Sequence, residues 1–169
     1  VFSKSNGDNT VNVDFSNFDA NRTPTIQRNR FTTEDEFEEE VQYSLNYQKK
    51  FEREGHILTF DYQYSKGIDN ENSIIEEVIL GDNIALDTER TIDDQTQVSQ
   101  LVQMDYVLPF GKDNQSQFEI GYRGTFNNNN TDFDFGIEQQ DGSFNSDPNF
   151  SNELNYKEYV NAAYTQLGS

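Results

Sequence analysis

Two acidic segments are the parts of the sequence whose residue types come closest to a chemical site. DNENSIIEE (69–77) and DFDFGIEQQDGSFNSDPN (132–149) are rich in carboxylate and amide oxygens, which are the ligands that Ca²⁺ prefers. Neither has the ligand spacing of an EF-hand loop. We therefore expect no cofactor, with two alternatives for these acidic loops: they are simply solvated, or they hold Ca²⁺.

Catalytic chemistry has little support in the sequence. His56, the only histidine, follows Gly55 in a turn, where a surface role is expected. No nucleophile elbow accompanies it. Zinc clusters of the usual kind cannot form with one histidine and no cysteine. Carboxylates such as Glu38, Glu39 and Glu40 are too abundant to mark a site. We expect that the protein is not an enzyme.

The composition limits the classes of partner and fold. The formal charge is −19, from 31 acidic and 12 basic residues, so nucleic acid is not expected as a partner. Hydrophobic residues make up 33% and mean hydropathy is −0.91, yet aromatics reach 14%, which a disordered chain would lack. No apolar run approaches the ~20 residues of a membrane-spanning helix, whereas a membrane strand needs only ~10 alternating residues.

Alternation of apolar and polar residues with a period of two predicts strands. It is clear around Val41–Tyr47, Leu58–Tyr64, Val98–Leu108 and Phe118–Phe126, and it returns in the last strand at Val160–Tyr164. The residues expected on the apolar face are Tyr43, Leu45, Tyr47, Leu58, Phe60, Tyr62, Met104, Tyr106, Leu108, Phe118, Ile120, Tyr122, Val160 and Tyr164. The charged residues expected on the opposite face are Asp61, Asp105, Glu119 and Arg123.

The connections between these strands alternate in length. Short turns are expected at 52–55 and 110–116, and long polar loops at 66–94 and 127–152. Within the first loop, SIIEEVIL (73–80) could instead extend its strand. The pattern predicts an antiparallel meander with both short turns at one end and both long loops at the other.

Two units follow from this organisation. Residues 1–35 are expected to form a polar loop or a weak edge strand. Residues 36–169 are expected to form about five strands.

Two all-β folds fit strands with one apolar and one polar face. In a soluble extracellular β-sandwich, acting as a binding or adhesion module, the apolar face would meet a second sheet. In a transmembrane β-barrel it would meet lipid, and the polar face would meet an aqueous lumen. Aromatic residues near strand ends, charged residues at mid-strand and the alternation of short and long loops favour the barrel. The expected fold is an antiparallel up-and-down meander that forms part of a transmembrane β-barrel wall.

Arg123 has two interpretations in this arrangement. It is expected on the polar face, with Asp105 or Gln103 as neighbours across the hairpin. An ion pair that fastens adjacent strands is the favoured interpretation, and contact with a ligand or a plug in the lumen is the alternative.

Three stretches together resemble a known family. QMDYVLPF (103–110), followed by a turn and FEIGYRG (118–124), resembles a hairpin of the Bacteroidota outer-membrane β-barrel family related to TonB-dependent receptors. EEEVQYSLNYQKKFEREGHILTFDYQYS (38–65) is similar to the preceding hairpin of that family, and LNYKEYVNAAYTQLG (154–168) to its recurrent strand with an Ala-Ala-Tyr centre. The resemblance covers about residues 31–169.

The resemblance implies a place in the bacterial outer membrane and a role in ligand uptake or in a larger outer-membrane complex. Members of the family are large barrels with an N-terminal plug, whereas this sequence has about five strands and no plug. We therefore expect an internal piece of a longer barrel, with open edges on both sides. The implied partners are outer-membrane lipid, the remaining strands and plug of the same barrel, and TonB or a surface lipoprotein.

Overall fold

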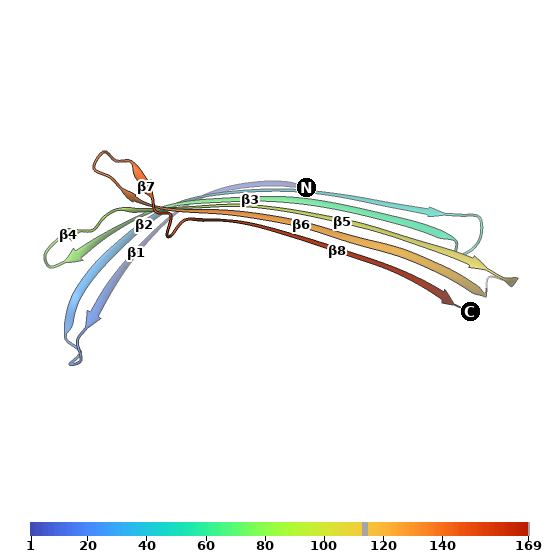
Figure 1. The fold of residues 1–169 in the computed structure, drawn as a ribbon, viewed down its shortest axis with the longest axis horizontal. Coiled ribbons are helices and arrows are strands. Elements are labelled where there is room, and N and C mark those ends of the chain that lie inside the picture. The colour runs from blue at the N-terminus through green and yellow to red at the C-terminus, as the bar shows by residue number, and fades with distance from the viewer. Residues whose placement is uncertain (113–114, 169) are drawn as a thin grey trace.

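The computed structural model describes residues 1–112 and 115–168 of the chain (Figure 1). The described residues form one antiparallel sheet of eight strands, two of them short. No helix among them is long and apolar enough to cross a membrane. The strands are β1 (Phe2–Phe18), β2 (Pro24–Lys50), β3 (Ile57–Leu80), β4 (Ile84–Ala85), β5 (Glu89–Phe110), β6 (Ser116–Glu138), β7 (Phe144–Ser146) and β8 (Asn152–Gly168).

The six long strands pair in chain order, so the expected up-and-down meander is confirmed. β1 pairs with β2, β2 with β3, β3 with β5, β5 with β6, and β6 with β8. The short strands β4 and β7 pair with β3 and β6, respectively, at one end of the sheet. The β2–β3 and β5–β6 turns lie together at the other end (Figure 1). We call the half of the sheet next to these two turns the proximal half, and the opposite half the distal half.

Side chains and glycines fix the tight turns. In the β1–β2 turn, Oδ1 of Asp19 accepts hydrogen bonds from the backbone N–H groups of Asn21 and Thr23, both at 2.8 Å. In the β2–β3 turn, Gly55 has a φ of 78°, which a residue with a side chain rarely adopts. The N–H of Phe51 donates to the carbonyl of His56 at 3.0 Å and closes this turn.

The distal parts of the strands are longer than the sequence pattern indicates. Residues 66–94 and 127–152 are not loops over most of their length, because β3 continues to Leu80, β5 begins at Glu89 and β6 continues to Glu138. Residues 1–35 likewise form β1, an edge strand, and the start of β2. These segments are rich in Asn, Asp and Glu, which have low strand propensity, and the ladder with neighbouring strands overrides that preference.

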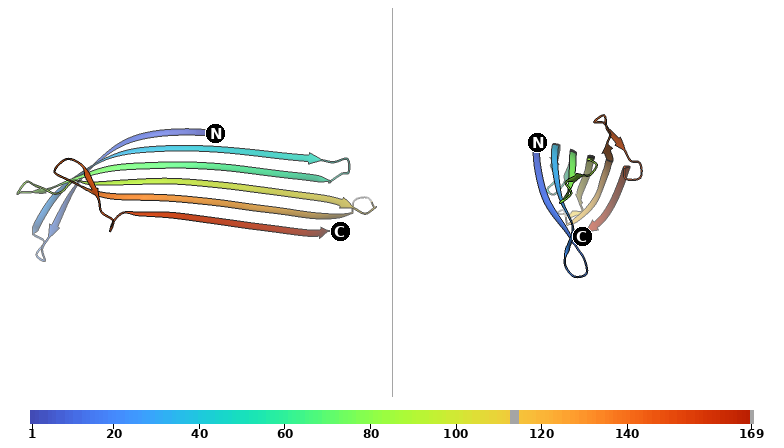
Figure 2. Two further views of the ribbon diagram at one scale, coloured as in Figure 1. Left: turned by 45° about the horizontal axis from the view of Figure 1, so that its top comes forward. Right: turned by 90° about the vertical axis from the view of Figure 1, so that its left-hand side faces the viewer.

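The sheet is open and has no hydrophobic core. β1 and β8 are its edges, and the described residues show no pairing between them (Figure 2). No hydrophobic side chain in the described ranges is buried. A sandwich would bury one face of this sheet against a second sheet, so the sandwich interpretation is wrong for the part of the chain that the structure describes.

Candidate functional site

The strand register sorts the side chains of the proximal half onto two faces. Residues directly opposite each other on neighbouring strands share a face. Phe60 lies opposite Tyr47 on one side and Met104 on the other, and Met104 lies opposite Tyr122. We call the face that carries these residues and Leu58 the Leu58 face, and its opposite the Asp61 face. The register places twelve of the expected apolar residues together on the Leu58 face: Tyr43, Leu45, Tyr47, Leu58, Phe60, Tyr62, Met104, Tyr106, Leu108, Phe118, Ile120 and Tyr122.

Two residues of β8 were assigned to the wrong face. Val160 lies opposite Thr125 and Tyr164 lies opposite Gly121, and both partners belong to the Asp61 face. On β8 it is Tyr159, the neighbour of Phe126 at a ring-centroid distance of 5.8 Å, that lies on the Leu58 face. The sequence of β8 has apolar residues on both faces, so alternation alone does not fix its orientation.

All four expected charged residues lie on the Asp61 face. Asp61 lies opposite Gln103, which lies opposite Arg123, and Asp105 lies opposite Gly121; Glu119 belongs to the same face of β6. Side-chain hydrogen bonds link the polar groups of this face, both along β5 and across strands. Asn46 donates to Asp61, Gln103 donates to Oδ2 of Asp105 at 2.8 Å, and the hydroxyl of Tyr164 donates to Oδ1 of Asp105, also at 2.8 Å.

Gly121 makes room for the Tyr164 ring on the Asp61 face. A Cβ at this position would meet Cε1 of Tyr164 and Oδ1 of Asp105 well inside van der Waals distance. The absence of a side chain therefore lets the ring lie over the backbone of β6 and reach the Asp105 carboxylate two strands away. This contact fastens β8 to the sheet.

Arg123 does not form the expected ion pair. It is exposed and lies opposite Gln103, and the ion pairs of the described residues do not include it. It lines a groove of about 540 Å³ that also includes Gln42, Gln63 and Ser99. A second groove of about 610 Å³ shares Ser99 and continues distally, lined mostly by serine, amide and carboxylate side chains.

His56 belongs to an aromatic cluster at the proximal turns. Its ring stacks on Phe51 with centroids 3.9 Å apart, and its Nε2 lies 2.8 Å from the hydroxyl of Tyr106. The Nζ of Lys49 lies 4.8 Å from the centroid of the Phe51 ring. The cluster packs side chains of the β2–β3 turn against Tyr106 of β5 at this end of the sheet.

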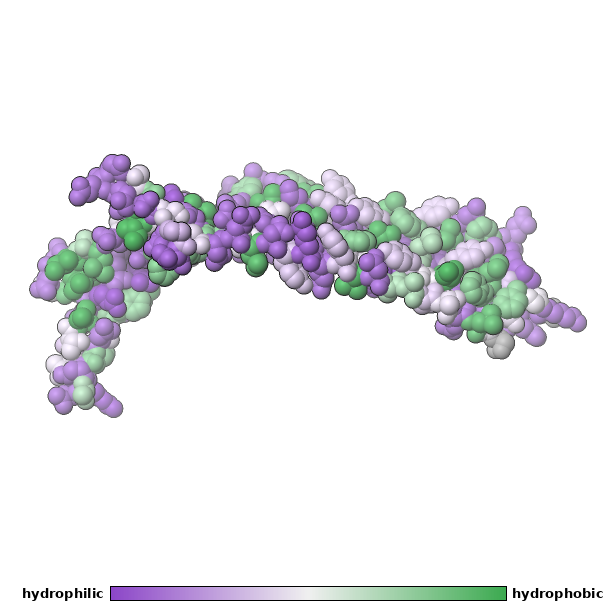
Figure 3. Space-filling model, viewed as in Figure 1, coloured by the Kyte–Doolittle hydropathy of each residue, from purple (hydrophilic) through white to green (hydrophobic). Residues whose placement is uncertain are grey.

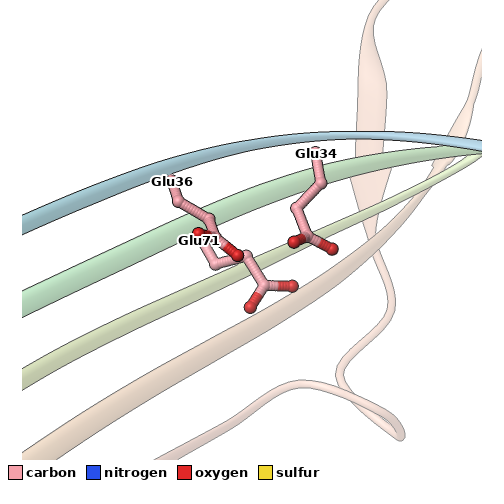
Figure 4. A group of neighbouring side chains, drawn as sticks. All are labelled: Glu34, Glu36 and Glu71. Carbon is pink, nitrogen blue, oxygen red and sulfur yellow. The ribbon is translucent and has the colours of Figure 1, made fainter. Parts of the chain in front are cut away.

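Three carboxylates gather on the Asp61 face of the distal half (Figure 4). Glu34 and Glu36 come from β2 and Glu71 from β3, and one oxygen of each lies within 4.8 Å of the others. Glu71 belongs to the acidic segment 69–77, but its neighbours come from β2, which the sequence did not indicate. A hydrogen bond with Glu34 and the charges of Glu34, Glu71 and Glu38 raise the pKa of Glu36 above its usual range. Oxygen ligands of this kind suit Ca²⁺.

The other acidic segment, 132–149, uses its carboxylates to hold its own turn. Asp134 accepts hydrogen bonds from the hydroxyls of Ser146 and Ser151 and lies 3.6 Å from the guanidinium of Arg90. Chiefly because of the Ser146 hydrogen bond, its pKa lies below the usual range. The hydroxyl and N–H of Ser143 likewise lower the pKa of Asp141.

Glu77, the last residue of the acidic segment 69–77, forms ion pairs that the sequence did not predict. Only 8% of its side chain is exposed, and its two oxygens lie 2.8 Å from the guanidinium groups of Arg28 and Arg30. All three lie on the Asp61 face near the distal end of β2 and β3. The sequence shows no signal for the pair, since β2 and β3 meet only in the fold.

Hydropathy differs along the length of the sheet. Figure 3 shows apolar residues toward both ends of the sheet, and strongly hydrophilic residues through the middle of the view. The strands of 22 to 27 residues in β2, β3, β5 and β6 are about twice the length that crosses a bilayer. A membrane-crossing segment and an extension beyond it both fit within one strand.

Comparison with known proteins agrees with this architecture. The model of the outer membrane protein beta-barrel family matches residues 49–169, from the end of β2 through β8. A search of curated proteins found no match. The chain therefore belongs to the outer membrane protein beta-barrel family, and its sheet is part of a transmembrane barrel wall in the bacterial outer membrane.

Proposed function

We propose that the chain forms part of the wall of a barrel that takes up a ligand, in the manner of TonB-dependent receptors. The Leu58 face contacts outer-membrane lipid, and the Asp61 face lines the lumen. The edges of β1 and β8 pair with further strands of the same barrel, since lipid does not tolerate unpaired backbone groups.

The polar lining of the Asp61 face is the observation that carries this proposal. Asp61, Asp105, Glu119 and Arg123 lie at mid-strand, and a charged side chain there is tolerated only where water or protein meets it. The two grooves on this face offer amide, hydroxyl and carboxylate groups that can bind a polar ligand or a plug. The open arc of six long strands also fits a barrel with a wide interior.

A receptor-like barrel has a partner on the periplasmic side. Purified full-length protein is expected to bind the periplasmic domain of TonB in a saturable manner. Liposomes that contain it are expected to resist osmotic swelling in small sugars, because a plug closes the lumen. Absence of TonB binding together with free swelling would show an open pore and overturn the receptor proposal, while leaving the barrel fold intact.

A role in a larger outer-membrane complex is the second candidate. Val11, Val13 and Phe15 lie on the Asp61 face of the distal half and are 42%, 38% and 38% exposed. Apolar residues at this place suit a protein partner such as a surface lipoprotein. Copurification of one defined lipoprotein with the full-length protein, lost in Val13→Asp, would support this candidate; retention in Val13→Asp would refute this site.

A further inference from the structure

The Leu58 face has a band without acidic residues, and this band has a sharp distal limit. From the row Leu108–Phe118–Leu167 to the row Tyr43–Tyr64–Gln100–Phe126–Tyr159, the described residues of this face include no Asp or Glu, and Lys49 next to the proximal turn is the one lysine. The most distal row of this band, Tyr43–Tyr64–Gln100–Phe126–Tyr159, is rich in aromatic residues, as expected where a barrel crosses the membrane interface.

Lysines appear in the next row. Lys66 on β3 lies opposite Val41 and Val98, and Lys157 on β8 lies opposite Asn128. One row further, Lys4 lies opposite Glu39 and its Nζ is 4.8 Å from the centroid of the Phe37 ring. Beyond that row the face becomes acidic, with Asp94, Asp132, Glu153, Asp8, Asp35 and Asp134.

Lys66 and Lys157 form no ion pair with any residue that the structure describes. The ion pairs of residues 1–112 and 115–168 involve Arg28, Arg30 and Arg90, and neither lysine. Lys157 is exposed, and its cross-strand neighbour is an amide. In a chain with a formal charge of −19, two unpaired cations directly above an aromatic row form a surface complementary to an anion at the same height.

The position of the lysines in the membrane follows from strand geometry. Successive rows of one face are ~6.6 Å apart along a strand, so the band without acidic residues is about 27 Å long. At a strand tilt of about 40°, this length spans about 20 Å along the membrane normal. This is close to the apolar band of outer-membrane barrels. Two of the distal connections, those after β3 and β6, are longer than both proximal turns, and long connections are typical of the extracellular side, which places the lysines at the outer leaflet.

We propose that Lys66 and Lys157 bind phosphate groups of the phosphorylated glycolipid of the outer leaflet. The lysine stems cover the apolar boundary, and the ammonium groups reach the phosphate plane. The acidic rows distal to the lysines repel the same phosphates, so the glycolipid phosphates are held at the level of the two lysines. This inference concerns the lipid-facing surface and is independent of the ligand that the barrel transports.

Binding of bisphosphorylated lipid A to the full-length protein in detergent tests the proposal. The double variant Lys66→Gln/Lys157→Gln is expected to retain less lipid A by native mass spectrometry, with affinity reduced by about fivefold for each lysine lost. Dephosphorylated lipid A is expected to bind the wild type and the variant equally. EDTA is present throughout, so that divalent ions cannot bridge phosphate to Glu39.

Two controls keep the result decisive. Lys66→Arg/Lys157→Arg retains the charge and is expected to bind as the wild type does, which also shows that the site tolerates substitution. Lys50→Gln removes a lysine from the Asp61 face at the proximal end and is expected to have no effect. Equal retention of bisphosphorylated lipid A by the double Gln variant, folded as judged by heat-modifiable gel migration, would overturn the proposal.

Discussion

On β6, the two faces of the strand exchange polarity between the proximal and the distal half. On β6, the Leu58 face carries Phe118, Ile120 and Tyr122 in the proximal half and then Asn128, Asn130 and Asp132 in the distal half. The Asp61 face changes in the reverse sense, from Glu119 and Arg123 to Phe133, Phe135 and Ile137. The pairing of β6 with β5 and β8 continues without a register shift.

This inversion shows that the surroundings, and not the ladder, set the polarity of each face. In the proposed barrel, lipid meets the Leu58 face of the proximal half and water meets its Asp61 face. In the distal half of β6 the polar Leu58 face is expected to meet water, while on the Asp61 face the ring of Phe150, from the β7–β8 connection, lies 5.5 Å from the ring of Phe135. On β2 the Asp61 face stays charged in the distal half, with Glu34 and Glu36. We therefore expect the bilayer boundary near the inversion on β6.

The largest expected effect comes from a charge in the proximal half. Phe60→Arg places a cation near the middle of the band without acidic residues on the Leu58 face. It is expected to destabilise the folded barrel by about 2–4 kcal/mol. Asn70→Arg adds the same charge to the same strand and face in the distal half, opposite Asp94, and is expected to have little effect. Urea-induced unfolding of the full-length protein from lipid vesicles measures both; equal losses would break the distinction between the halves.

A second variant sharpens the contrast within the Asp61 face. Gly121→Ala forces the Tyr164 ring away from Asp105 and is expected to cost about 1–3 kcal/mol. Gly67 lies on the same face as Gly121, at the point where β3 enters the distal half. A Cβ at Gly67 would meet nothing within 4 Å. Gly67→Ala is therefore expected to leave the unfolding midpoint unchanged or to raise it slightly. A loss in Gly67→Ala as large as in Gly121→Ala would contradict this account of the glycine.

The Arg–Glu pair tests whether the distal half has its own source of stability. Glu77→Gln leaves two arginines without their carboxylate, at a cost of about 1–3 kcal/mol, below that of a fully buried pair because Arg28 and Arg30 are partly exposed. Hydrogen exchange is expected to quicken in the distal amides of β2 and β3 and to stay unchanged around Phe60. The matched control is Glu76→Gln, because Glu76 is exposed on the opposite face of the same strand. An equal loss of protection of the distal amides in Glu76→Gln would contradict a specific role of Glu77.

The smallest expected effect is a pH dependence of the distal half. The pKa of Glu36 is raised in the folded protein, so the folded state binds this proton more tightly than the unfolded state. Stability is therefore gained as the pH falls through the folded pKa, and the repulsion is fully present above it. Glu36→Gln is expected to slow distal hydrogen exchange at pH 7 and to flatten this pH dependence. Because the group is exposed, salt should weaken the effect; an unchanged pH profile in Glu36→Gln would assign the dependence to other groups.

The sequence was sufficient for β3 and β6 in the proximal half because apolar and polar residues alternate strictly there. Leu58–Tyr64 and Phe118–Phe126 have large apolar residues at every second position, with one glycine, so strand, face and turn could all be predicted. Distal strands such as β1 meet water, so their polar residues carry no such alternation. Their extension depends on hydrogen bonds to neighbouring strands, which the sequence pattern does not show.

Features that arise from the register were also beyond the sequence. Val160 and Tyr164 seemed to continue an apolar face, yet β8 has apolar residues on both sides and only pairing with β6 fixes its orientation. The absence of an ion pair at Arg123 and the meeting of Glu77 with two arginines likewise follow from which strands become neighbours. A one-residue shift would exchange every one of these faces.

The most direct test of the two-faced wall is a cysteine scan along β3 of the full-length protein in lipid vesicles, since this chain has no native cysteine. Single cysteines at 58–64 carry a spin label, and collisions with oxygen in lipid and with a water-soluble nickel chelate are measured. We predict lipid exposure at 58, 60, 62 and 64, water exposure at 59, 61 and 63, and water exposure of the Leu58 face at 70, 72 and 76. Equal water exposure of both faces at 58–64 would contradict the assignment of the Leu58 face to lipid.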